Sequence, residues 1–370
     1  MLALLVATTA SLATPIAPTR DDEVVQTLPS SSAQRNEDRR LRRQLAQNPR
    51  DAALAVQVAR RHLERAREDG DPRQAGQALA ALSAWTDDVD TPIEVLLMQA
   101  TLQQHLHDFD GAAARLEGAL ARHPQQPQGW LTLATVRRVQ GRYAASDAAC
   151  DRLQALGVAV YGTACRAEND ALRGRFEPAR AALAKLLAQA GSSGELRAWL
   201  LTTIAEVEQR AGAAAAAESA FRASLRERPD LYTALGYADL LLEQRRNAEV
   251  PALLKPWPRS DAVLLRLALA DPRGDAAAEL RVRIAQANER PGTETLHGRE
   301  QAMFALVVEA KPARALELAR ENARTQREPL DLLVLAQAAK ASGDARALDE
   351  ARALVREIGL HDRRIDALLS

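Results

Sequence analysis

The chain's reactive side chains are few, and they form no catalytic pattern. The polar cluster that most resembles a set of metal ligands is His105, His107, Asp108 and Asp110. The two histidines are two residues apart at a predicted helix end, so they point to different faces and a shared ion would need an irregular turn. The sequence contains no GxSxG, HExxH or GxxxxGK[ST] motif, and no GxGxxG motif after a strand. We therefore expect no metal site, no cofactor and no enzymatic activity.

Cys150 and Cys165 are the only cysteines of the chain. In an exported protein, an even pair of cysteines is a candidate disulfide. Such a bond would close a loop of about 15 residues and contribute up to about 3 kcal/mol. The alternative is that the two side chains are buried separately as small apolar groups. Close CxxC-like spacing, typical of redox-active pairs, is absent.

The elements that carry these residues repeat every 33 to 34 residues. A period of this length is typical of helix pairs that bury their apolar faces only by stacking on one another. Hydrophobic residues make up 47% of the chain but aromatic residues only 3%, and the abundance of alanine and leucine favours close helix packing. We therefore predict an all-α solenoid of about nine stacked antiparallel helix pairs, with Cys150 and Cys165 on adjacent helices. The period appears first in the turn residues His107, Gly141 and Gly174 and in the aromatic residues Phe109, Tyr143 and Phe176.

The repeating unit resembles the tetratricopeptide repeat, most clearly over residues 93–259. A bulky residue early in the first helix, small residues in the second helix, a turn glycine and a closing proline are the features that carry the resemblance. It implies a right-handed superhelix whose first helices line a concave groove for a protein or peptide partner. Within single units, the matching residues are Trp130, Leu133, Ala134, Gly141, Tyr143, Ser146 and Leu153; Ala217, Phe221 and Pro229; and Ala112, Ala119, Leu120 and Pro124.

The domain organisation follows from the same pattern. We predict a signal peptide over 1–17, a linker over 18–33, a capping helix over 34–49, a degenerate helical repeat over 50–92, five tetratricopeptide-like repeats over 93–259, and degenerate repeats with a C-terminal cap over 260–370. The turn positions predict that the fourth unit begins at Ala198 and the fifth at Leu231. The register of the units is least regular after Pro251.

The resemblance assigns groove-facing positions within each unit. The carboxylate-binding clamp known in this family needs Lys, Asn and Arg there, whereas the fifth and ninth positions of this chain carry no such set, which contradicts a clamp. The second position instead holds Tyr161, Trp199 and Tyr232 in three successive units, and the ninth position of the same units holds Glu168, Glu206 and Asp239. Aromatic residues beside acids would suit a peptide with basic or aromatic side chains. The alternative is that the aromatic residues fill gaps between units and the acids are solvated. The residues at the fifth position are Leu97, Leu131, Ala164, Thr202 and Leu235, and those at the ninth begin with Thr101 and Thr135.

Charge and the N-terminal segment limit the class of function. The chain carries 49 basic and 49 acidic residues, and arginine alternates with acids, so we expect no nucleic-acid partner. The apolar residues 2–17 indicate export, for example to the periplasm, and no later segment is apolar enough to span a membrane. The sequence therefore predicts an exported, non-catalytic scaffold that binds a protein. A cytosolic adaptor or regulator, and a helper in polysaccharide assembly, remain alternatives.

Overall fold

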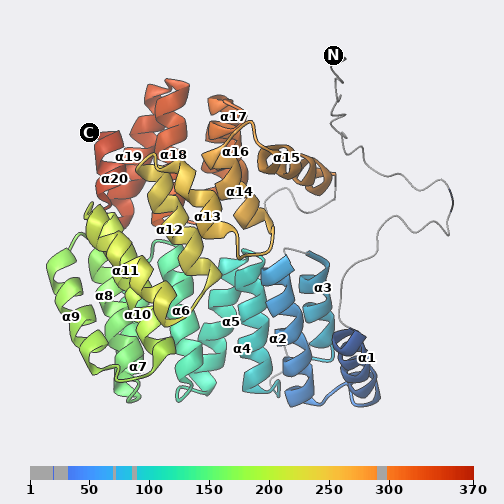
Figure 1. Ribbon diagram of the computed structural model, residues 1–370. Coiled ribbons are helices and arrows are strands. Elements are labelled where there is room, and N and C mark those ends of the chain that lie inside the picture. Colours follow the sequence, from blue (N-terminus) through green and yellow to red (C-terminus); the bar gives the residue numbers. More distant parts are fainter. Residues whose placement is uncertain (1–19, 21–31, 70–71, 86–89, 290–297) are drawn as a thin grey trace. The chain divides into compact units, whose positions relative to one another are not determined.

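The computed structural model describes residues 20, 32–69, 72–85, 90–289 and 298–370 (Figure 1). Within these ranges the chain forms twenty α-helices, one short 3-10 helix and no strand, as the all-α prediction requires. The predicted signal peptide, and the predicted linker except residues 20, 32 and 33, lie outside the described residues. The chain divides into two compact units, with the boundary between Asn48 and Pro49.

The first unit contributes α1 (Ser32–Gln47). This helix overlaps the helix predicted over 34–49 and ends just before Asn48 and Pro49. Proline disfavours helical geometry in the residue before it, which explains the end of α1. The role of α1 as a cap stays a prediction.

The second unit is a series of stacked helix pairs, and its described residues contain nine of them, followed by α20 (Arg363–Leu369). The first helices are α2 (Ala52–Asp69), α4 (Ile93–His105), α6 (Pro127–Val139), α8 (Ala159–Leu172), α10 (Gly194–Arg210), α12 (Leu231–Glu243), α14 (Asp261–Ala270), α16 (Gly298–Val307) and α18 (Pro329–Ser342). The second helices are α3 (Pro72–Ala81), α5 (Phe109–Arg122), α7 (Tyr143–Ala155), α9 (Phe176–Gln189), α11 (Ala214–Glu227), α13 (Val250–Leu254), α15 (Asp275–Asn288), α17 (Pro312–Asn322) and α19 (Ala345–Ile358).

A left-handed residue joins the two helices of most pairs. Gly141, at φ 72°, donates its N–H to the carbonyl of Arg138 at 2.9 Å, and the following N–H of Arg142 reaches the carbonyl of Arg137 at 2.8 Å. Glycine suits this turn because a side chain disfavours positive φ. His107 at φ 62° and Arg245 at φ 59° adopt the same conformation without being glycine. The predicted turn position is therefore a backbone requirement of the fold.

The units differ in the lengths of their helices. Helix α10 begins at Gly194, one turn earlier than the predicted start at Ala198, because the Ser193 side chain accepts a hydrogen bond from the N–H of Leu196 and caps the helix there. Helix α12 begins at Leu231, as predicted. Around Pro251 two helices are short: α13 has 5 residues and α14 has 10, whereas the later helices α15, α18 and α19 have 14 each. The irregular register thus coincides with two short helices rather than with a different fold.

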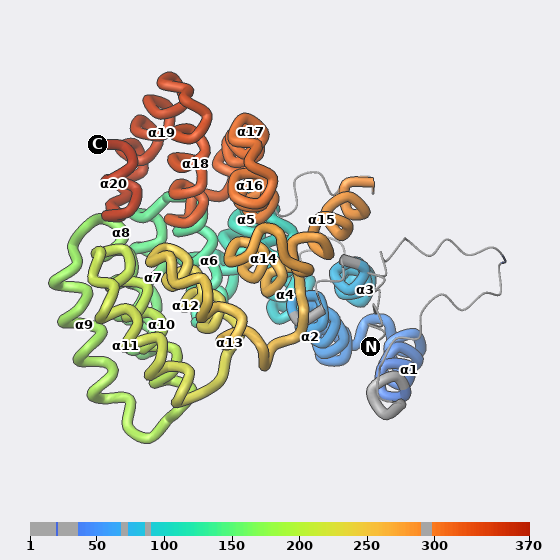
Figure 2. Tube along the Cα trace, turned by 45° about the horizontal axis from the view of Figure 1, so that its top comes forward, coloured from blue at the N-terminus to red at the C-terminus, as the bar shows by residue number. Residues whose placement is uncertain are grey.

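The last helices of the second unit pack against the turns of earlier pairs, in what we term the return contact (Figure 1, Figure 2). The N–H of His361 donates to the carbonyl of Leu172 at 2.8 Å, and the N–H of Arg327 donates to that of Val139 at 2.7 Å. The guanidinium of Arg364 forms an ion pair with Glu243 at 2.6 Å across 121 residues of sequence. Leu172 also lies in the same apolar cluster as the side chains of the last two pairs. The series of pairs therefore closes on itself, which the sequence did not predict.

Candidate functional site

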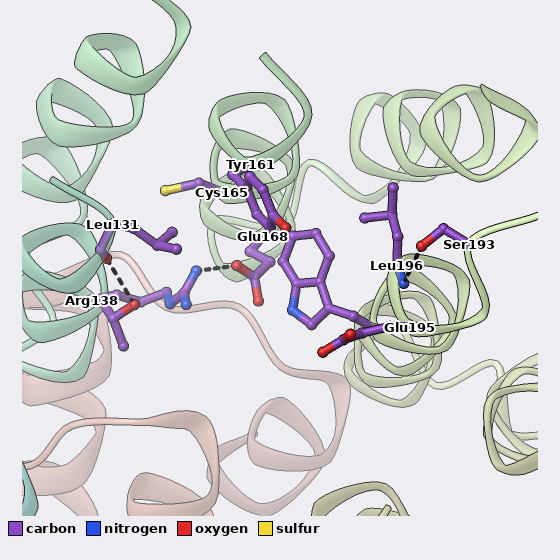
Figure 3. Close-up of a pocket in the computed structure, with 10 residues that line it drawn as sticks. Leu131, Arg138, Tyr161, Cys165, Glu168, Ser193, Glu195 and Leu196 are labelled. Carbon is purple, nitrogen blue, oxygen red and sulfur yellow. Dashed lines mark hydrogen bonds and ion pairs between the residues drawn. The ribbon is translucent and has the colours of Figure 1, made fainter. Parts of the chain in front are cut away.

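Two cavities lie against the first helices of the second unit, and the six candidate groove residues all line one or both of them. The first cavity, of about 450 Å³, lies between α6, α8 and α10 (Figure 3). Its walls are Leu131, Thr135, Arg138, Tyr161, Cys165, Glu168, Ser193, Glu195, Leu196 and Trp199.

A pair of aromatic rings, one exposed and one half-buried, lines the first cavity. The rings of Tyr161 and Trp199 are 5.3 Å apart between centroids and tilted by 43°. Tyr161 is 40% exposed, and few other large apolar side chains are exposed among the described residues. Leu131 and Leu196 complete an apolar surface around the pair. Such a surface can receive a flat or apolar side chain.

The second cavity, of about 340 Å³, lies between the earlier first helices and the helices of the return contact. Arg138 and Glu168 line both cavities, so the two are neighbours. The walls of the second cavity are strongly charged but balanced in sign. Its basic residues are Arg138, Arg210, Arg266, Arg299 and Arg364, and its acidic residues are Glu168, Glu206, Asp239, Glu300 and Glu328.

Arginines from neighbouring helices pair with two acids of the predicted acidic row. Glu168 forms an ion pair with Arg138, and Figure 3 shows the two side chains meeting at the edge of the first cavity. Asp239 accepts two hydrogen bonds from Arg266, at 2.9 and 2.8 Å. The row therefore offers less unpaired negative charge than its sequence indicates.

Glu206 has a different environment. Its Oε1 accepts a hydrogen bond from the Tyr232 hydroxyl at 2.5 Å, and the guanidinium of Arg210 lies 4.0 Å from its other oxygen. Burial raises the pKa of Glu206 above its ordinary range, with opposing effects from Arg210 and the Tyr232 hydrogen bond. The charge of Glu206 and the hydrogen bond to it raise the pKa of Tyr232 well above 10. The Tyr232 side chain is 66% exposed, because it lines the open cavity.

The predicted fifth positions do not all face a cavity. Leu131 and Leu235 line one, whereas Ala164 is fully buried. Thr202 is also buried, and its hydroxyl forms hydrogen bonds of 2.8 Å with the hydroxyls of Ser224 and Thr233 between helices. That position is thus a packing position in two of the units.

Cys150 on α7 and Cys165 on α8 are joined by a disulfide, with their Cα atoms 5.7 Å apart. Cys165 lies at the wall of the first cavity. The bond therefore links two successive helix pairs directly behind the aromatic surface. Its formation in the expressed protein stays a prediction.

The four residues His105, His107, Asp108 and Asp110 lie in and beside the turn between α4 and α5. His107 adopts the left-handed conformation, and the Asp108 side chain caps α5 by accepting the N–H of Gly111 at 2.9 Å. In the described ranges, no group of three or more His, Cys, Asp and Glu side chains is placed to hold a metal ion. Across the same part of the chain, we find no helix that combines the length and apolar character of a membrane span.

Sequence reasoning missed the arginines of the second cavity and the residues of the return contact. A signal for part of this set was available, because Arg138 and Arg210 each precede a turn glycine by three residues or fewer. Their partners could not be read in the same way, because Arg266, Arg299 and the helices after them lie where the repeat loses its regularity.

The chain matches no protein-family model and no curated protein. Solved structures with a similar fold include a tetratricopeptide repeat protein from Parabacteroides merdae, at 13% identity and a TM-score of 0.41, covering 76% of this chain and 99% of that one. A second is the TPR domain of P58(IPK), at 16% identity and a TM-score of 0.25, covering 86% of this chain and 96% of that one. A third is a chain of the structure of Naa15/Naa10 bound to HypK-THB, at 14% identity and a TM-score of 0.25, covering 86% of this chain and 65% of that one. Because identities and TM-scores are low, the description as a tetratricopeptide-like array rests on the chain's own period and helix pairs.

Proposed function

We propose that the chain is a non-catalytic binding protein that holds an extended segment of a partner protein against the first cavity. The observation that carries the proposal is the pair formed by exposed Tyr161 and half-buried Trp199 in a cavity of about 450 Å³. Large apolar side chains that stay exposed in a groove mark binding surfaces more often than packing positions.

The dimensions of the first cavity suit a peptide. Its walls come from three successive first helices, and packed helices lie about 8–10 Å apart. The distance from α6 to α10 is then about 16–20 Å, which corresponds to five or six residues of extended chain. An aromatic or arginine side chain in the middle of such a segment would stack on Tyr161 and Trp199. Glu195 at the wall adds a carboxylate that favours arginine.

The test is selection from a displayed peptide library on the purified protein, followed by affinity measurement with a labelled selected peptide. We expect enrichment of peptides with an aromatic or arginine residue. Trp199→Ala should weaken binding about tenfold or more, in line with aromatic residues at the centres of interfaces. Val307→Ala, at another exposed apolar side chain outside both cavities, is the matched control and should change nothing. Absence of enrichment, or equal binding by the Trp199 variant, would refute the proposal.

We infer further that the protein acts outside the reducing cytosol. The apolar N-terminal segment and the disulfide between Cys150 and Cys165 support this inference, because such bonds persist in oxidising compartments. Mass spectrometry of the mature protein should find an N-terminus near Thr14 or Pro18 and no alkylatable thiol. An intact Met1 with two free thiols in a cytosolic fraction would instead support the cytosolic adaptor.

A further inference from the structure

The first cavity presents hydrogen-bond donors that no part of the described chain engages. Within the described residues, neither the Nε1–H of Trp199 nor the hydroxyl of Tyr161 forms a hydrogen bond. By contrast, the Nε1–H of Trp130, outside both cavities, donates to the carbonyl of Pro124 at 2.9 Å. Four buried side-chain polar atoms in the described ranges lack a hydrogen bond, and the Trp199 Nε1 is not one of them, so this donor is open to solvent. Both rings can therefore offer a donor to a partner beside their apolar surface.

The acceptors at the walls of the first cavity are already bonded to other parts of the chain. Glu168 is ion-paired with Arg138, and Glu195 with Arg228 at 3.0 Å. The Ser193 side chain accepts a backbone N–H at the start of α10. A partner backbone that brings N–H groups to this cavity would bury them with few acceptors, which is unfavourable. Proline has no N–H and keeps its carbonyl acceptor, so a proline-rich segment matches these groups.

The spacing of the walls distinguishes between the conformations that a bound segment can adopt. The first helices α6, α8, α10 and α12 contact one another in order, and packed helices lie about 8–10 Å apart. One turn of polyproline II helix advances three residues by about 9.3 Å. The two-residue repeat of a β-strand advances about 6.6–6.8 Å, and one turn of α-helix about 5.4 Å. Polyproline II is thus the conformation whose repeat matches the helix spacing.

Each of these first helices offers an apolar or aromatic side chain to such a repeat. Helix α6 contributes Leu131, α8 contributes Tyr161 and α10 contributes Trp199 to the first cavity, and Figure 3 shows Leu131 and Tyr161 on different helices of its wall. Helix α12 contributes Tyr232 to the neighbouring second cavity. A segment with one turn for each helix presents the same face to every helix, so every third side chain points into the groove. Grooves lined by aromatic side chains are surfaces on which polyproline II segments dock.

We propose that the partner segment is proline-rich and binds this groove as a polyproline II helix, with one turn of three residues for each first helix. This step rests on the proposed function. The aromatic or arginine side chain that stacks on Tyr161 and Trp199 is one of the groove-facing side chains, and prolines around it hold the backbone in this conformation. A polyproline II helix has no internal hydrogen bonds, so its carbonyls accept from the Trp199 Nε1–H and the Tyr161 hydroxyl.

The main test is a substitution scan of a peptide selected on the wild-type protein, which does not depend on the folding of any variant. Alanine should lower the affinity about tenfold at every third position and change it little in between. At the positions in between, proline should raise the affinity about two- to fivefold, and glycine should lower it by a similar factor, because they restrict or loosen the free peptide. Losses at every second position, or tighter binding of the glycine peptides than of the proline peptides, would overturn the polyproline II conformation.

Two protein variants test the assigned hydrogen bonds. Trp199→Phe and Tyr161→Phe each keep an aromatic ring and remove one donor, and each should weaken binding of the selected peptide about two- to tenfold. Trp257→Phe is the matched control, because Trp257 is half-buried in an apolar cluster and lines neither cavity. Its affinity for the peptide should equal that of the wild type. Unchanged affinity of both Trp199→Phe and Tyr161→Phe would overturn the hydrogen bonds to the partner's carbonyls.

A pair of synthetic peptides separates this inference from the proposed function. A nonapeptide of three Pro-Pro-Tyr triplets should bind the full chain at least about tenfold more tightly than one of three Gly-Gly-Tyr triplets, which keeps the tyrosine spacing on a flexible backbone. If library-selected peptides bind but the proline peptide has no advantage over the glycine peptide, the polyproline II conformation is overturned and the peptide site stands. If neither the library nor the synthetic peptides yield binding, both proposals are overturned.

Discussion

The return contact can be tested by adding a single methyl group at turns that share one backbone conformation. Gly141 and Gly343 have φ values of 72° and 69°. A Cβ at Gly141 would lie 3.0 Å from Cγ2 and 3.3 Å from Cβ of Ile358, whereas a Cβ at Gly343 would meet no heavy atom within 4 Å. Gly141→Ala and Gly343→Ala therefore carry the same backbone penalty, and only the first disturbs the return contact.

The expected magnitudes follow from these contacts. The left-handed conformation costs alanine about 1–2 kcal/mol, and the lower entropy of the unfolded alanine chain offsets about 0.4–1 kcal/mol of that. Gly343→Ala should then lower the free energy of unfolding by about 1 kcal/mol. At Gly141 the crowding against Ile358 should add about 1–3 kcal/mol, the usual range for overpacking. The difference between the two variants measures the return contact.

Urea unfolding followed by circular dichroism gives both free energies. A third variant, Ile358→Ala, opens the space that the new methyl group needs. The double variant Gly141→Ala/Ile358→Ala should lose less stability than the two single changes add up to, because the sites are in contact. If Gly141→Ala and Gly343→Ala destabilise equally, within about 0.5 kcal/mol, and the cycle shows no coupling, the last helices do not pack on this turn as described.

Three further predictions concern stability. Replacing Cys150 and Cys165 together by serine should lower the free energy of unfolding by about 3 kcal/mol, and dithiothreitol should have the same effect on the wild type but none on the variant, measured by urea unfolding. Burial raises the pKa of Asp331 to about 7, so the folded protein holds the proton of this carboxyl group more tightly than the unfolded chain does. The free energy of unfolding should therefore fall as the pH rises from about 4 to 7, by at most about 1.4 kcal/mol per pH unit. Asp331→Asn should flatten that pH profile. Arg245 is exposed and has a φ of 59°, so Arg245→Gly should raise the melting temperature. The expected gain in the free energy of unfolding is about 0.5–1 kcal/mol, after the greater entropy of the unfolded glycine chain is subtracted. A lower melting temperature would contradict a strained turn.

The sequence predicts the local features of this fold because they depend on few residues. A turn that needs positive φ favours glycine, which makes the positions of Gly141 and Gly174 visible at a fixed spacing. The start of α12 at Leu231 was predictable for the same reason, since it lies at a constant distance from the repeat's turns. The early start of α10 was not predictable, because the cap at Ser193 that lengthens this helix depends on a single side chain and breaks the periodic pattern.

The candidate site was only half predictable. Tyr161, Trp199 and Glu168 occupy repeating positions, so the period places them on the cavity-lining helices. Arg266 could not be paired with Asp239 from the period, because α14 belongs to a short and irregular unit. Long-range contacts such as that of His361 with Leu172 have no periodic signature at all, since they join units of different register.

The return contact connects the stability of the array to the proposed binding site. In an open repeat array each unit contacts only its neighbours, and stability is close to a sum of neighbouring terms. Here the second cavity has walls from α8, α10 and α12 on one side and from α16, α18 and α20 on the other, so it exists only while the return contact is closed. A partner segment that extends into the second cavity would therefore bind the closed state alone and stabilise it by mass action. It follows that Gly141→Ala, whose methyl group would lie against Ile358 and outside the residues that line either cavity, should weaken the binding of such a segment in the second cavity while leaving contacts to Tyr161 and Trp199 unchanged.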